Sequence, residues 1–271
     1  MLLSVSHTTR YRYEEPVPYG LMQIRLTPTS GPLQEVVEWD HDIVGASIHA
    51  AFNDQHRNRV HLLGTNEGTT EVSITVRGQV ETFDSGGVIP HLDGHAPLWL
   101  YTRATPFTTM GHALQTLRDA SPLNQNPNPG VMELHELSAL VLSEVAYEPG
   151  RTVSQTTAEE AVQSGHGVCQ DHAHVFATLV RSAGMPVRYV SGYLSLDEGQ
   201  EDASHAWAEA WVEHLGWVGF DVSNGISPDD RYVRIAAGLD YHDVAPITGI
   251  RTGAGEESLE VHVTVEDQPQ Q

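Results

Sequence analysis

The chain has 271 residues, 39% of them hydrophobic and 18% charged, so it can bury one large core or two moderate ones. Its formal net charge is −22, and all 14 cationic side chains are arginines because the sequence contains no lysine. A field of this sign repels phosphate backbones and anionic lipids, so we expect neither nucleic acid nor a membrane as a partner.

The N-terminus and the cysteine usage indicate a cellular location. Residues 1–7 lack a basic segment followed by an apolar run, so we expect no signal peptide. No apolar stretch approaches the ~20 residues that a membrane-spanning helix needs. Cys169 has no second cysteine with which to form a disulfide within the chain, as is typical of a reducing compartment. We therefore expect a cytoplasmic protein.

The N-terminal part of the chain predicts an antiparallel β-domain over residues 1–90. Apolar and polar residues alternate, β-branched and aromatic residues are frequent, and Pro and Gly residues separate the segments. The alternating segments are residues 6–13, 36–40, 60–63 and 72–80. We find no group of chemically reactive side chains in this domain. Residues 84–97 are rich in Gly, Pro and His and predict a linker.

Residues 91–271 predict a second domain that mixes helices with strands. Apolar residues at helical spacing, a capping-box pattern and the stop signal Gly184-Met185-Pro186 define the helices. We expect helices over 110–120, 131–147, from 156 onward and after Cys169, and strands over 187–194, 205–212, 217–222 and 259–265. The last of these strands could pair with either domain. The fold class is therefore α+β.

Cys169 follows the glycine-rich segment Ser164-Gly165-His166-Gly167 and opens a predicted helix. The N–H groups and the positive dipole end of a helix N-terminus favour the thiolate over the thiol. The backbone N–H of Cys169 could also donate to an oxyanion that forms when the sulfur attacks a carbonyl. Asp171 lies in the same first turn and predicts a structural cap for the helix. Cys169 is thus a candidate nucleophile.

His205 and Asp221 stand on two predicted strands joined by a hairpin turn at residues 213–216. An imidazole can take the proton of a thiol if a carboxylate holds its other ring nitrogen as a donor. Side chains alternate between the two faces of a sheet along each strand. The two residues therefore share a face only if the numbers of residues that lie opposite each other add to an even value. A register that sets Trp207 opposite Asp221 would meet this condition.

Other readings of these residues stay open. His166, Cys169, His172 and His174 could form a metal site, but His172 and His174 do not share a helix face, and a second cysteine is missing. Packing is the expected role of His174, and His172 is expected to be neutral to function. Glu209 is a second candidate partner for the imidazole of His205. We expect neither a metal nor a cofactor.

Two further observations concern an arginine and the tryptophans near the candidate triad. Arg188 could pair an acid near the site, but a surface ion pair is the expected arrangement. Three tryptophans flank the triad, and we interpret them as core residues and as a wall of the cleft: Trp207, Trp211 and Trp217.

The motifs around these residues resemble those of bacterial transglutaminase-like proteins. Residues 167–174 (GVCQDHAH), 183–193 (AGMPVRYVSGY), 202–207 (DASHAW), 216–225 (GWVGFDVSNG) and 240–246 (DYHDVAP) carry the resemblance. They follow the family's Cys, His, Asp order, and the β-domain resembles the N-terminal domain of such proteins. The resemblance implies a papain-like core in which a helix bearing the cysteine packs on an antiparallel sheet.

The resemblance also implies roles and activities. Cys169 would be the nucleophile, His205 the general base and Asp221 the carboxylate that orients the imidazole. The expected reaction is acyl transfer or hydrolysis at an amide bond of a protein or peptide, as in transglutaminases, deamidases or proteases. The sequence departs from the pattern at His172, where members often carry an aromatic residue. The alternative is a non-catalytic binding module with the same fold, and the oligomeric state is not specified by these motifs.

Overall fold

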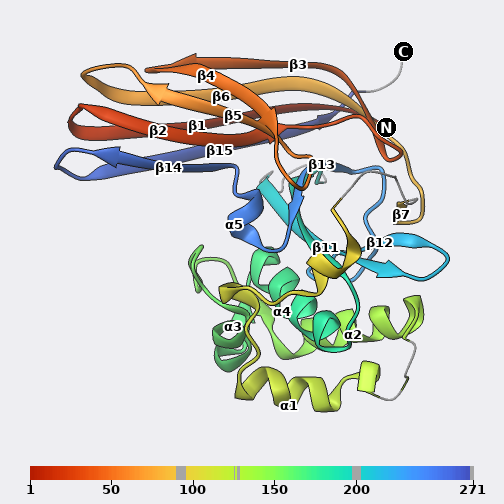
Figure 1. The fold of residues 1–271 in the computed structure, drawn as a ribbon. Coiled ribbons are helices and arrows are strands. Elements are labelled where there is room, and N and C mark those ends of the chain that lie inside the picture. The colour runs from red at the N-terminus through yellow and green to blue at the C-terminus, as the bar shows by residue number, and fades with distance from the viewer. Residues whose placement is uncertain (90–95, 125, 127–128, 197–202, 269–271) are drawn as a thin grey trace.

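The computed structural model describes residues 1–89, 96–124, 126, 129–196 and 203–268 (Figure 1). The predicted linker at 84–97 and the boundary between the two expected domains fall partly on residues 90–95, which lie outside the described residues. No helix within the described ranges is long and apolar enough to cross a membrane.

Two four-stranded antiparallel sheets form the upper layers of the molecule in Figure 1. Burial alternates along the first strand because one face of each sheet packs on the other. The core between the sheets contains Met22, Ile24, Leu63 and Ile74. The strands are β1 (Leu2–Val17), β2 (Tyr19–Thr27), β3 (Gln34–Val44), β4 (Ala46–Asn53), β5 (Arg59–Thr65), β6 (Thr69–Thr82), β14 (Ile247–Thr252) and β15 (Glu257–Asp267).

The end of the chain returns to these N-terminal strands. β15 pairs with β1, with Val265 opposite Val5, and β14 pairs with β2, with Ile247 opposite Ile24. The sequence left open which domain the final strand would pair with. In the structure it pairs with the N-terminal sheets. Residues 247–267 contribute an edge strand to each of the two sheets.

A five-stranded antiparallel sheet in the order β13-β10-β11-β12-β7 lies below these layers and carries the helices on one face (Figure 1). Its strands are β7 (Val88–Ile89), β10 (Val187–Leu194), β11 (Ala203–Val212), β12 (Gly216–Phe220) and β13 (Tyr232–Gly238). The helices are α1 (His112–Ala120), α2 (Val131–Glu144), α3 (Ala158–Ser164), α4 (Cys169–Ser182) and α5 (Tyr241–Val244).

Helix α4 is the central helix and packs on β11. Ala208 and Ala210 of β11 are fully buried in the same core as Phe176 of α4, and their small side chains allow the helix to approach the sheet. The ring of Phe176 stacks on Phe220 of β12 with 5.2 Å between centroids. The α+β prediction, with the cysteine on a helix that packs against an antiparallel sheet, is confirmed.

The predicted helix at 131–147 was too long at its C-terminal end. Helix α2 ends at Glu144, and residues 146–147 instead form the short strand β8 (Ala146–Tyr147). This strand pairs in parallel with β9 (His166–Gly167), which immediately precedes α4. A partner distant in sequence thus overrides the helical spacing and fixes the segment that leads to Cys169.

Candidate active site

Cys169 is the first residue of α4, with Val168 as the N-cap. Its side chain is partly exposed, and the core of the molecule begins with Ala173, one turn further along the helix. A sulfur at this point lies among the unpaired N–H groups of the first helical turn, where negative charge is stabilised. Cys169 therefore has both the access and the electrostatic setting of a nucleophile.

The two glycines before Cys169 have local structural roles. Gly165 has φ of 72° and ends α3 in the left-handed region, which glycine adopts without steric cost. Gly167 leaves room for Asp171, because a Cβ at this position would lie 2.6 Å from the Cβ of Asp171. These constraints fix the conformation of the turn that places Cys169 at the start of α4.

Asp171 caps α4, in agreement with the structural role expected for it. Its Oδ2 accepts hydrogen bonds from the backbone N–H of Val168 at 2.8 Å and from Oγ1 of Thr152 at 2.7 Å. The side chain is only 1% exposed, so these donors replace water for a buried carboxyl group. Asp171 thereby fixes the helix end that carries the sulfur.

Replacing Asp171 with alanine should lower the free energy of unfolding by about 1–2 kcal/mol, because the Val168 N–H and the Thr152 hydroxyl lose their acceptor. Guanidinium denaturation followed by circular dichroism measures this change. Asp119→Ala is the matched control, since Asp119 is exposed on α1 and pairs only with Arg118 at the surface. Equal losses in the two variants would contradict the capping role.

His205 and Asp221 come together across the hairpin formed by β11 and β12. Ala208 lies opposite Phe220, and this register has the parity that the shared-face condition requires. Nε2 of His205 and Oδ2 of Asp221 are 2.7 Å apart, and the two side chains are 10% and 0% exposed. The other ring nitrogen, Nδ1, makes no bond to Asp221, and Cys169 is close enough to the ring to raise the pKa of His205.

Asp221 is held by more donors than His205 alone. Its Oδ2 also accepts from the hydroxyl of Tyr232 at 2.7 Å and from Nδ2 of Asn224 at 2.6 Å. Burial alone would raise the pKa of Asp221, but the hydrogen bond and charge of His205 and the bonds from Tyr232 and Asn224 lower it. The carboxylate is therefore both ionised and fixed in orientation.

The surroundings of His205 favour its protonated form. Burial would lower the pKa of His205, but hydrogen bonds with Asp221 and Cys169, together with the negative charges of both, raise it to about 10. The ring of Trp207 stacks beside the imidazole at 6.5 Å, and that of Tyr232 lies at 6.0 Å. An imidazolium held between a sulfur and a carboxylate is the arrangement that general acid–base catalysis with a cysteine nucleophile uses.

Two residues of this constellation were missed from the sequence. Asn224 lies three residues after Asp221 in the segment Val222-Ser223-Asn224-Gly225, and its proximity to an Asp in a turn was the available signal. Tyr232 begins β13, and its contact with Asp221 depends on how strands from different parts of the chain are placed. Periodicity along the chain contains no such information.

The histidines of α4 have partners of their own. His172 is fully buried; its Nε2 donates to the carbonyl of Val145 at 2.8 Å, and its Nδ1 accepts from Oγ of Ser223 at 2.9 Å. This side chain connects the segment before β8 with the turn that follows Asp221. Its predicted neutrality to function remains a prediction, although the ring has a clear structural role.

His174 packs inside the protein, as expected. Its ring stacks on Phe107 at 5.0 Å, and its Nε2 accepts from the backbone N–H of Tyr241 at 3.1 Å. Burial lowers the pKa of His174 to about 3, so the ring is neutral. Among the described residues, no three His, Cys, Asp or Glu side chains are grouped so that they could hold a metal ion.

The expectations for Glu209 and Arg188 were wrong. Glu209 is 0% exposed, and instead of meeting His205 its carboxylate accepts from Nε of Arg188 and from Nε of Arg234 at 3.1 Å. Arg188 is 7% exposed and therefore not part of a surface pair. The three residues stand on three different strands, so only the assembled sheet brings them together.

Comparison with known proteins assigns the chain to a family. The model of the transglutaminase-like superfamily matches residues 120–222, which contain Cys169, His205 and Asp221. The model of the bacterial transglutaminase-like N-terminal region matches residues 3–81. Residues 120–222 belong to the transglutaminase-like superfamily.

This transglutaminase-like chain has relatives over its whole length. It is 29% identical over 283 residues to an uncharacterised protein of Mycobacterium leprae, a match that covers 97% of this chain and 98% of that protein. It is also 29% identical over 289 residues to an uncharacterised protein of Mycobacterium tuberculosis, covering 98% and 92% of the two chains. A shorter match, 35% identical over 83 residues, links it to a protein-glutamine gamma-glutamyltransferase of Pseudomonas aeruginosa and covers 27% of this chain and 12% of that protein.

A solved structure supports the fold. The crystal structure of a candidate cysteine protease from Cytophaga hutchinsonii superimposes with a TM-score of 0.78 at 20% identity, covering 100% of this chain and 92% of that chain. At this identity the likeness shows a shared fold. Together with the family models, it supports membership of a family of cysteine enzymes that act on amides.

Proposed function

We propose that this chain is a cysteine enzyme that opens an amide bond of a protein or peptide through a thioester acyl-enzyme at Cys169. The observation that carries the proposal is the 2.7 Å contact between Nε2 of His205 and Oδ2 of Asp221, on the sheet against which α4 packs with Cys169 as its first residue. In this proposal His205 is the general acid and base, and Asp221 holds its ring in place.

The acylation step uses the ionised sulfur. The thiolate of Cys169 attacks the carbonyl carbon of a glutamine carboxamide or a peptide bond, and the negative charge moves to the carbonyl oxygen. The backbone N–H of Cys169 is positioned at the helix start to donate to that oxygen. The C–N bond then breaks, His205 gives its proton to the leaving nitrogen, and ammonia or an amine departs.

The deacylation step decides the overall reaction. His205, now neutral, takes a proton from water or from a primary amine, whose oxygen or nitrogen attacks the thioester carbon. The C–S bond breaks and Cys169 returns as the thiolate beside a protonated His205. Water gives deamidation or proteolysis, and an amine gives a new amide. The chain has no lysine, so its own side chains cannot provide the amine.

Mass spectrometry of glutamine-containing peptides, incubated with the protein in the presence and absence of a primary amine, tests the proposal. Attachment of the amine, conversion of a carboxamide to an acid and cleavage of the chain give three distinguishable products. Cys169→Ser is the control and should form none of them. Products formed equally by wild type and Cys169→Ser would overturn the assignment of the nucleophile.

The competing proposal is a binding module that keeps the fold without catalysis. It predicts an ordinary thiol at Cys169, so the reactivity of the sulfur separates the two proposals. The single cysteine and the strongly acidic surface support our placing the enzyme in the cytoplasm, with a protein or peptide as its partner. Fractionation of cells that express the tagged protein tests this placement, and recovery from an extracytoplasmic fraction would refute it.

A further inference from the structure

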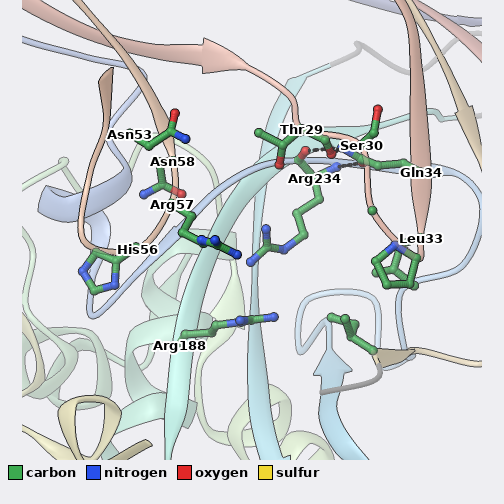
Figure 2. Close-up of a pocket in the computed structure, with 13 residues that line it drawn as sticks. Thr29, Ser30, Leu33, Gln34, Asn53, His56, Arg57, Asn58, Arg188 and Arg234 are labelled. Atoms are coloured by element: carbon green, nitrogen blue, oxygen red, sulfur yellow. Dashed lines mark hydrogen bonds between the residues drawn. The ribbon is translucent and has the colours of Figure 1, made fainter. Parts of the chain in front are cut away.

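A cavity of about 290 Å³ lies at the junction between the N-terminal sheets and the five-stranded sheet (Figure 2). Its walls are residues 29–34 before and at the start of β3, residue 53 at the end of β4, residues 56–58 between β4 and β5, Ile89, and Arg188 and Arg234 from the five-stranded sheet. This volume is near the lower end for pockets that hold small molecules. None of the catalytic candidates lines it.

Three guanidinium groups converge on this cavity. In Figure 2, the side chains of Arg57 and Arg234 extend toward each other, and that of Arg188 lies below them. The sequence has only 14 cationic side chains against 36 acidic ones, yet none of the described residues that line the cavity is Asp or Glu. Like charges around one space repel one another unless anionic groups lie between them.

Two of the arginines are fixed by a buried carboxylate. Glu209 accepts from Arg188 and Arg234, and Arg188 lies over the ring of Trp217 at 4.3 Å. The backbone of Arg234 is held by Gln34, whose side-chain amide forms hydrogen bonds of 2.8 Å with both its N–H and its C=O. One carboxylate between two guanidiniums leaves one positive charge, so Glu209 does not neutralise this side of the cavity.

The third arginine is held at the mouth of the cavity by a braced loop. Arg57 has φ of 67°, a left-handed conformation that favours Gly or Asn over a long side chain. The carboxylate of Asp54 accepts from the N–H groups of His56 and Asn58 at 2.9 Å each. Asn58 in turn bonds both the N–H and the C=O of Ala237 at 2.8 Å, which anchors the loop to the edge of the five-stranded sheet.

We propose that this cavity is a binding site for a small dianion with carboxylate or phosphate oxygens. Three guanidiniums and one carboxylate leave a net charge of two positive units, which a dianion balances. The planar fork of a guanidinium matches paired oxygens with two parallel hydrogen bonds. The cavity combines donors from both parts of the fold, so the bound anion would also link the N-terminal sheets to the five-stranded sheet.

Isothermal titration calorimetry of the full chain with inorganic phosphate and, separately, with succinate tests the proposal at ionic strength kept constant with sodium chloride. We expect saturable binding of one or both anions with a 1:1 stoichiometry. Binding of phosphate alone indicates a tetrahedral oxyanion as the ligand class, and binding of succinate alone indicates a dicarboxylate. Absence of saturable binding for both would overturn the proposal.

Arg57→Gln should weaken the binding by about tenfold or more, because a charge-assisted contact is lost. Arg118→Gln, which removes a charge of the same sign from the exposed face of α1, should leave the affinity unchanged. Because the side chain of Arg57 is exposed, the variant should keep its fold. Thermal unfolding of the unliganded variant checks this. Equal affinity of Arg57→Gln and wild type would refute this location. Cys169→Ser should bind as wild type does, so the result is independent of catalysis.

Discussion

Replacing His205 with alanine should lower kcat/KM for an amide substrate by about 10⁴-fold or more. In the proposed mechanism the variant loses the base that takes the thiol proton and the acid that protonates the leaving nitrogen. Steady-state kinetics with the peptide that gives a product in the mass-spectrometric assay measure the loss. Because the side chain is 10% exposed and lies at the edge of the core, the fold should survive the substitution.

His112→Ala is the matched control for this substitution. His112 is an exposed histidine at the start of α1, away from the candidate site, and its removal should change kcat/KM by less than about twofold. Retention of more than about one tenth of the wild-type kcat/KM in His205→Ala would contradict the proposed role of the imidazole, because a general acid and base contributes about 10²-fold or more.

Asp221→Asn should lower kcat/KM by about 10³- to 10⁴-fold while preserving the fold. The amide replaces a carboxylate that accepts from His205, Tyr232 and Asn224, so the ring loses both its charged partner and the acceptor that fixes its tautomer. Burial of His205 remains and continues to disfavour its protonated form. The pKa of His205 should therefore fall from about 10.

The pH dependence of kcat/KM measures this change. A protonated His205 donates to the leaving nitrogen, so wild-type activity should persist as pH rises and decline only as His205 loses its proton near pH 10. In Asp221→Asn this decline should move to lower pH. Tyr232→Phe is the control: it removes one of the donors to Asp221 but keeps the carboxylate, so its effect should be far smaller. An unchanged alkaline limb in Asp221→Asn would argue against the coupling between the two residues.

Local sequence patterns predicted much of the machinery around Cys169. The glycine-rich segment and the following apolar stripe predicted a helix that begins at the cysteine, and α4 does begin there. The strand over 187–194 has the predicted bounds. The strand over 217–222 ends two residues early, at Phe220, because Asp221 leaves the ladder and forms an isolated bridge with Ile226. That departure belongs to the turn that brings Asn224 back to the carboxylate.

Apart from Asn224, the features that sequence reasoning missed depend on contacts between distant segments. Arg188, Glu209 and Arg234 lie on β10, β11 and β13. Only the pairing of these strands in one sheet shows that the buried carboxylate of Glu209 accepts hydrogen bonds from both guanidiniums. Arg57 comes from the β-domain, in which no reactive group was recognised. Its approach to Arg188 and Arg234 follows from the docking of the two parts of the fold, which hydrophobic periodicity does not encode.

The rate at which iodoacetamide alkylates Cys169, measured across pH in wild type and in His205→Ala, tests the central claim most directly. An activated thiolate predicts that wild-type alkylation stays fast well below the free-cysteine pKa of about 8.5. In His205→Ala the alkylation rate should begin to fall at a higher pH than in wild type as the solution is made more acidic. Alkylation that follows an ordinary thiol in both proteins, with no difference between them, would contradict the account and favour a binding module.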